Sequence, residues 1–205
     1  MPRVSIKKSR FIDLFIAAIN IPYCDSIKNQ TVANIFSKLA KPLESKEKPI
    51  GQYPFIPTSA TTLFYLEVAI KAYKDIAKKD IKVCDIGGGI SPLLYILSSH
   101  ITNPKNLVSL EYNINLCDFV NSNELGFKAI QGDLLTYTDY SDYDILYSYN
   151  PLSNSGLMEK GILQIIDNMK KDQIFIFNNA GVYGSFMTDN GFKYLGTYGL
   201  FYYIK

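Results

Sequence analysis

The sequence predicts an α/β protein. It has a doubly wound, mostly parallel sheet over residues 81–205, with a C-terminal antiparallel hairpin, and an N-terminal helical extension over residues 1–80. Three observations support this fold class. Short apolar segments typical of buried strands alternate with helical segments from residue 81 onward. A glycine-rich turn at residues 87–89 joins the first of these strands to its helix. The last two strands, at residues 191–196 and 198–204, are so close in sequence that only a hairpin can connect them.

The extension is predicted to be helical because its apolar residues recur at helical spacing. The expected helices are residues 9–21, a second from the N-cap Asp25 to the residue before Pro42, and a third from the cap Thr58 or Ser59 to about Lys79. A Lys-, Pro- and Glu-rich stretch at residues 41–49 is expected to be a loop.

The core is predicted to alternate strands and helices. Its expected parallel strands are residues 81–86, 106–111, 127–132, 143–149 and 173–177. One expected helix directly follows the glycine-rich turn, and two others span residues 114–121 and 157–170. Too few residues separate the third and fourth strands for a full helix between them.

The composition excludes several classes of protein. The three cysteines (Cys24, Cys84 and Cys117) form no CxxC pair, and His100 is the only histidine. The sequence therefore has too few ligands for a Cys/His zinc site and too few cysteines for a disulfide framework. A serine–histidine hydrolase is disfavoured for the same reason. The apolar segment at residues 11–21 is too short to span a bilayer, and no cleavage site follows it. We therefore expect a cytoplasmic protein with no metal ion and no membrane contact.

The net charge is only +2, but it is unevenly distributed. Residues 1–80 contain 13 Lys/Arg and 7 Asp/Glu, whereas residues 81–205 contain 8 and 12. One interpretation is a solvated, lysine-rich helical surface, which is the usual role of such charge runs. The other is a basic face beside a catalytic core, which would contact an anionic substrate such as RNA or DNA.

Residues 83–92 (VCDIGGGISP) are the most informative segment of the chain. Glycines at a strand–helix junction let the backbone turn sharply and approach a ligand closely. The helix that begins near Pro92 presents unpaired N–H groups and the positive end of its dipole. A glycine-rich turn alone has an alternative interpretation, a tight turn that binds nothing.

Two further acidic residues stand at the ends of the next two predicted strands. Glu111 closes the second strand, where a carboxylate can accept hydrogen bonds from both ribose hydroxyls. Asp133 follows the third strand and can accept from an adenine amino group. Each acid alone could be a solvated strand end, but three acids at successive strand ends favour a nucleoside-containing ligand.

Together these residues resemble the Rossmann-like class I S-adenosylmethionine-dependent methyltransferase family over about residues 80–205. The family's glycine motif, acid-x-Gly-x-Gly, is similar to Asp85-Ile86-Gly87-Gly88-Gly89. The resemblance implies a methyltransferase with S-adenosylmethionine as cofactor. The residues that it implies for cofactor binding are Asp85, Gly87, Gly88 and Gly89 in the loop, Glu111 at the ribose and Asp133 at the adenine.

The end of the chain also resembles that family, which finishes with an antiparallel seventh strand inserted beside a sixth, as the hairpin at residues 191–205 does. The sequence departs from the family at Ser91, where many members carry a further glycine. It also departs in its shortened connection between the third and fourth strands.

A nicotinamide-dependent oxidoreductase is the competing enzyme class. Its fingerprint G-x-G-x-x-G would need a third glycine where Pro92 stands. Asp85 would also lie close to a pyrophosphate of like charge, whereas it suits the cationic groups of S-adenosylmethionine. The electrostatics therefore favour methyl transfer over hydride transfer.

The fourth strand ends in Asn150-Pro151-Leu152-Ser153. The amino-methylating branch of the family carries Asn/Asp-Pro-Pro-aromatic at this place, so Asn150 and Pro151 match and the next two residues do not. The resemblance implies that Asn150 and Pro151 are catalytic and align an amino group of a nucleic-acid base or a protein side chain. Two alternatives stay open: an Asn-Pro turn that only ends the strand, and a binding module of this fold without catalysis.

Overall fold

The structure is a computed structural model that describes residues 58–78, 80–101, 103–178, 183–195 and 199–205, together with the helical residues 31, 34 and 35. The elements with defined bounds begin with helix α3 (Ala60–Ala77), strand β1 (Val83–Ile86) and helix α4 (Pro92–Leu97). The remaining elements are η1 (Pro104–Asn106), β2 (Leu107–Glu111), α5 (Ile114–Ser122), β3 (Lys128–Gln131), η2 (Asp139–Asp142), β4 (Ile145–Tyr149), α6 (Ser155–Asn168), β5 (Ile174–Asn178), α7 (Gly184–Asp189), β6 (Lys193–Tyr194) and β7 (Phe201–Ile204).

The strands form one seven-stranded sheet in the order β3-β2-β1-β4-β5-β7-β6. Strands β1 to β5 are parallel, and β7 runs antiparallel to both of its neighbours. The strand order reverses at β1, so β1 and β4 form the switch point where doubly wound sheets bind ligands. The predicted fold class, including the C-terminal antiparallel hairpin, is confirmed.

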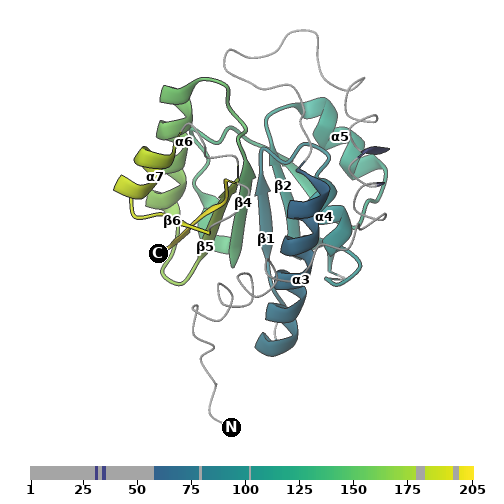
Figure 1. The fold of residues 1–205 in the computed structure, drawn as a ribbon. Coiled ribbons are helices and arrows are strands. Elements are labelled where there is room, and N and C mark those ends of the chain that lie inside the picture. The colour runs from purple at the N-terminus through teal and green to yellow at the C-terminus, as the bar shows by residue number, and fades with distance from the viewer. Residues whose placement is uncertain are drawn as a thin grey trace.

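Helices cover both faces of the sheet, with α3, α4 and α5 on one face and α6 and α7 on the other (Figure 1). Successive side chains of a strand point to opposite faces. Val83 accordingly packs with α3, α4 and α5, whereas Cys84 and Ile86 pack with α6 and α7. Asp85 therefore faces the α3–α4–α5 side, the same side as Tyr147 of β4.

Helix α3 is capped as the sequence predicts. The Ser59 hydroxyl accepts a hydrogen bond from the Thr62 N–H, and the helix ends where Lys78 adopts a left-handed conformation (φ 48°). Leu63 and Leu66 of α3 are fully buried in the core cluster that includes the strands. The helix is thereby packed directly onto the sheet.

Several details differ from the sequence-based expectation. Helix α7 was not expected, because only six residues form it and they show no apolar stripe. Strand β6 has only two residues. The short connection between β3 and β4 holds the single 3-10 turn η2, in agreement with the predicted lack of room for a helix.

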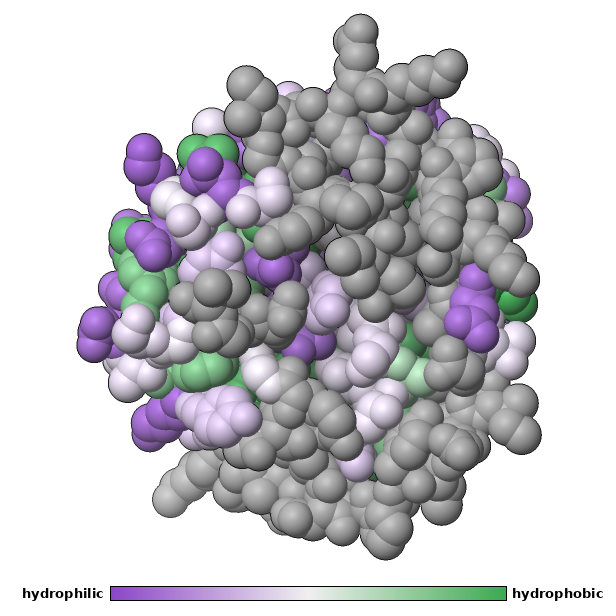
Figure 2. Space-filling model, turned by 45° about the horizontal axis from the view of Figure 1, so that its top comes forward, coloured by the Kyte–Doolittle hydropathy of each residue, from purple (hydrophilic) through white to green (hydrophobic). Residues whose placement is uncertain are grey.

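The expected helix at residues 9–21, the expected helix from Asp25 to the residue before Pro42 and the loop at 41–49 lie outside the described residues, apart from residues 31, 34 and 35. Within the described part of the chain, none of the helices has the length and apolarity needed to cross a membrane. Figure 2 shows a face on which hydrophobic and hydrophilic residues are interspersed over the described surface.

Candidate functional site

The glycine loop connects β1 to α4 at the carboxyl edge of the sheet. Gly87 and Gly89 have positive φ values of 69° and 57°, which L side chains rarely adopt. A Cβ on Gly87 would also lie 2.3 Å from the Cβ of Pro151. The ends of β1 and β4 therefore approach so closely that only glycine fits at residue 87.

Ser91 has a structural role that the sequence did not reveal. It too is left-handed (φ 36°), a conformation that glycine adopts more readily than serine. Its hydroxyl accepts from the Leu94 N–H, which caps α4, and donates to Oδ2 of Asp85 at 2.5 Å. The serine thereby joins the start of α4 to the acid at the end of β1.

Asp85 is almost fully buried, with 4% of its surface exposed. Burial raises its pKa from the ordinary 3.8 to about 7; the Ser91 hydrogen bond opposes this rise and the charge of Glu111 adds to it. A Cβ on Gly88 would lie 2.7 Å from the Asp85 carboxyl carbon, so the loop closes tightly over this carboxyl group. A cation beside Asp85 would favour the ionised form.

Glu111 lies at the same edge of the sheet as the glycine loop. Its Oε2 accepts from the Gly89 N–H at 2.9 Å and its Oε1 accepts from the Asn113 N–H at 2.8 Å. The side chain is 5% exposed. The structure therefore joins Glu111 to the loop directly, as a site shared by these residues requires.

Asp133 follows β3, the next strand at this edge. Its Oδ1 accepts from the Leu135 N–H at 2.9 Å, and its side chain is half-buried. Tyr112, which directly follows Glu111, is 48% exposed, and its carbonyl oxygen accepts a hydrogen bond from Gln131 of β3. This half-exposed tyrosine directly after β2 was not singled out from the sequence.

Asn150 stands at the end of β4 in an unusual state. Its backbone is left-handed (φ 43°), a conformation that is uncommon outside glycine but that asparagine adopts more readily than most residues. The side chain is 8% exposed, and nothing among the described residues donates a hydrogen bond to its Oδ1. A buried acceptor without a donor is costly, so this oxygen is suited to an N–H group of a ligand.

The three residues after Asn150 place no aromatic ring where the Asn/Asp-Pro-Pro-aromatic motif has one. Pro151 packs against Gly87, Leu152 packs against the α6–α7 core cluster, and Ser153 is exposed. Position 153 thus offers no ring, and the nearest tyrosine on β4 is the half-buried Tyr149.

A buried polar network lies at the ends of β4 and β5. The Tyr147 hydroxyl shares a 2.9 Å hydrogen bond with the Thr58 hydroxyl and accepts from Nδ2 of Asn178 at 3.2 Å. These residues are 89 and 31 positions from Tyr147 in the sequence. Sequence reasoning missed the network because nothing local marks residues so far apart as partners.

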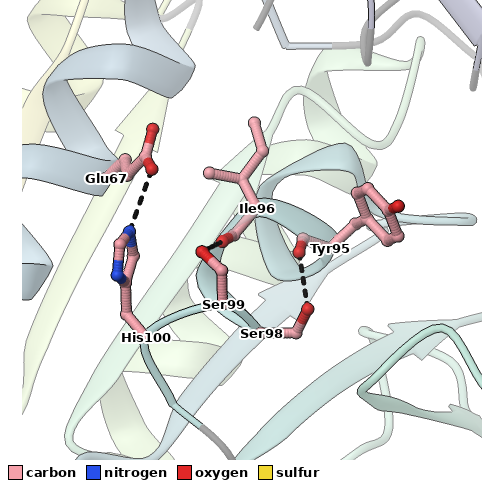
Figure 3. Close-up of polar contacts among 6 residues, drawn as sticks. All are labelled: Glu67, Tyr95, Ile96, Ser98, Ser99 and His100. Atoms are coloured by element: carbon pink, nitrogen blue, oxygen red, sulfur yellow. Dashed lines mark hydrogen bonds and ion pairs between the residues drawn. The ribbon is translucent and has the colours of Figure 1, made fainter. Parts of the chain in front are cut away.

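His100 lies away from this edge. Helix α4 starts at the glycine loop and runs back along the sheet, so the turn after it lies near the opposite edge (Figure 1). There His100 Nε2 is 2.9 Å from Oε1 of Glu67 on α3 (Figure 3), and the Lys74 ammonium donates to the His100 carbonyl. The histidine therefore ties α3 to the end of α4.

The donors and acceptors at the carboxyl edge fit S-adenosylmethionine. The side chains of Asp85, Glu111 and Asp133 and Oδ1 of Asn150 are acceptors, and the cofactor offers ammonium, ribose hydroxyl and amino donors. In the described part of the chain, no three His, Cys, Asp or Glu side chains are grouped to hold a metal ion. The structure brings Asp85, Glu111 and the glycines together; their binding roles remain predictions.

Of the comparisons with known proteins, the one with solved structures supports the fold. No protein-family model and no curated protein sequence matches the chain. Among solved structures, the chain is similar to a TehB-like SAM-dependent methyltransferase from Corynebacterium glutamicum (14% identity, TM-score 0.50, covering 87% of this chain and 98% of that one). It is also similar to precorrin-6y C5,15-methyltransferase from Geobacter metallireducens (15% identity, TM-score 0.47, covering 75% and 90%).

A third similar structure is an amino pentose methyltransferase from Micromonospora echinaspora (12% identity, TM-score 0.44), of which the match covers 48% and of this chain 55%. The chain thus spans about half the length of that enzyme. The strand order and the antiparallel β7, together with the likeness to the C. glutamicum protein over 87% of this chain, show the class I methyltransferase fold.

Proposed function

We propose that the protein is an S-adenosylmethionine-dependent methyltransferase. The observation that carries this proposal is the position of Glu111, whose carboxylate is hydrogen-bonded to the glycine loop at the carboxyl edge of β1 and β2. Each carboxylate oxygen can accept more than one hydrogen bond, so Glu111 can bind the loop and the ribose hydroxyls together. When bound, the cofactor supplies an electrophilic methyl group on a sulfonium ion.

The backbone of the loop argues against a dinucleotide. The N–H groups of Gly87, Gly89 and Ser91 already donate to acceptors within the chain. A pyrophosphate would need such donors, and it would lie beside the acids Asp85 and Glu111. A cationic cofactor has the opposite requirement, which these carboxylates meet.

The acceptor in this proposal is an amino group. The buried Oδ1 of Asn150 would accept an N–H of the acceptor and hold its nitrogen in line with the methyl group. Alignment of this kind needs no strong base, because positioning supplies much of the rate. The half-buried Tyr149 is the ring available for a planar substrate at this end of β4.

A nucleic acid is the first acceptor to test. Acids outnumber bases in residues 81–205, so contact with phosphates would have to come from the basic residues 1–80. A protein side chain is the other amino acceptor. A binding module without catalysis is the second candidate function, favoured by the absence of a ring at residue 153.

Calorimetric titration tests the cofactor. We expect wild type to bind S-adenosylmethionine and S-adenosylhomocysteine but not NAD. Glu111→Gln should lose about 10- to 100-fold in affinity, the worth of one hydrogen bond to a charged group. Glu159→Gln, on α6 at the opposite face, is the matched control and should bind as wild type. Binding of NAD, or unchanged binding by Glu111→Gln, would contradict the proposal.

Methyl-labelled cofactor tests the acceptor. The probes are single-stranded DNA, duplex DNA, RNA and a lysine-containing peptide. Asn150→Gly keeps the left-handed backbone but removes the amide, so transfer should fall at least 100-fold, whereas Asn150→Asp keeps an acceptor oxygen and should retain transfer. Tight cofactor binding with no transfer to any probe would favour the binding module.

A further inference from the structure

The network around Tyr147 lies next to the site without belonging to its binding residues. Tyr147 is 1% exposed and is the register partner of Asp85 on the neighbouring strand β1. Both side chains face α3, and the charge of Asp85 contributes to a raised pKa of the Tyr147 hydroxyl after the larger effect of burial. The two side chains are therefore close enough to interact.

The hydroxyl of Tyr147 holds two other elements in place. Thr58, directly before the Ser59 cap of α3, is 2.9 Å from it, and Asn178 at the end of β5 donates to it. Thr58 and Asn178 are themselves buried. One phenol thus fixes the start of α3 and the end of β5 beside the acid that would face the cationic end of the cofactor.

We propose that Tyr147 is a positioning residue for the amino-acid end of the cofactor, acting through Thr58 by holding the start of α3 against the Asp85 side of the site. This inference rests on the proposed function. The adenosine end is assigned to the other strands, β2 and β3, where Glu111 and Asp133 stand. Loss of the Tyr147 hydroxyl should therefore affect one end of the ligand and spare the other.

Two ligands separate these ends. S-adenosylhomocysteine carries the amino-acid end, whereas 5′-methylthioadenosine has the same adenosine and lacks it. Tyr147→Phe should bind S-adenosylhomocysteine about tenfold more weakly than wild type, the net worth of one or two buried hydrogen bonds. It should bind 5′-methylthioadenosine within twofold of wild type.

Two further variants keep the test independent of folding. Tyr143→Phe removes another buried, hydrogen-bonded phenol hydroxyl, but just before β4 starts and on the opposite face, so it should leave both affinities unchanged. Thr58→Val removes only the partner hydroxyl and should reproduce Tyr147→Phe, and the double variant should be no weaker than either single one.

The outcomes separate the two proposals. Equal losses for both ligands in Tyr147→Phe would show a general structural effect and overturn the positioning role. Wild-type affinity for S-adenosylhomocysteine in Tyr147→Phe or in Thr58→Val would overturn it as well. If wild type binds neither ligand, the proposed function fails and the role of Tyr147 fails with it.

Discussion

Replacing Asp85 by asparagine should make the protein more stable at neutral and alkaline pH. The Asp85 carboxyl is buried and its pKa is raised from 3.8 to about 7, so the folded state holds a proton that the unfolded chain releases. The contribution of the Asp85 carboxyl to the free energy of unfolding is therefore greatest below pH 3.8. It falls as the pH rises from about 4 to 7, and it stays low above pH 7. Asparagine cannot ionise and escapes that loss.

The magnitude follows from the two pKa values. A difference of about three units, at about 1.4 kcal/mol per unit, is about 4 kcal/mol at pH 8. At pH 5 only about 1.5 kcal/mol has been lost, so the advantage of Asp85→Asn should grow by about 2.5 kcal/mol between pH 5 and pH 8. The Ser91 hydroxyl can donate to the asparagine oxygen, which keeps that hydrogen bond.

Urea denaturation at pH 5, 6, 7 and 8 measures this difference directly. Asp189→Asn, an exposed acid on α7, is the control and should follow wild type at every pH. A stability difference between Asp85→Asn and wild type that does not change with pH would refute the reasoning. A loss of stability that grows toward pH 8 would refute it more strongly, because its sign is opposite.

Three other predictions concern the same edge of the sheet. Affinity for S-adenosylmethionine should rise between pH 6 and pH 8 in wild type, because the cationic cofactor favours ionised Asp85. Calorimetry on Asp85→Asn should show a lower affinity that depends less on pH. Binding near pH 7 should release protons in wild type, seen as a heat that depends on the buffer, and a buffer-independent heat would contradict this. Gly87→Ala should lower the free energy of unfolding by about 2–4 kcal/mol, because its Cβ would meet Pro151 and its φ is positive, whereas Gly156→Ala should change it by less than about 1 kcal/mol in the same urea experiment.

The sequence predicts the parts of this fold that local signals encode. The strand–glycine–helix junction at Gly87, the alternation of strands and helices, and the closing hairpin all depend on residues that are neighbours along the chain. The edge that Asp85 and Glu111 share was predictable too, because parallel strands bring their carboxyl ends to one side.

The features that the sequence does not predict depend on contacts between residues distant in the chain or on the backbone conformation. In the sequence Tyr147 is one more aromatic strand residue, and only the fold brings Thr58 to its hydroxyl. In the sequence Ser91 departs from a glycine motif, although the structure shows that it adopts the left-handed backbone that glycine would favour. The unsatisfied oxygen of Asn150 depends on what surrounds it in three dimensions, which spacing along the chain does not encode.

The bond between Thr58 and Tyr147 has a consequence for how the protein is made. At about 5–20 residues per second, a ribosome takes roughly 4–18 s to synthesise the 89 positions that separate them. During that time the apolar side of α3, with Leu63 and Leu66, has no β4 to pack against. Nascent chains stalled between α3 and β4 should therefore recruit a ribosome-associated chaperone, and release it once Tyr147 has left the exit tunnel.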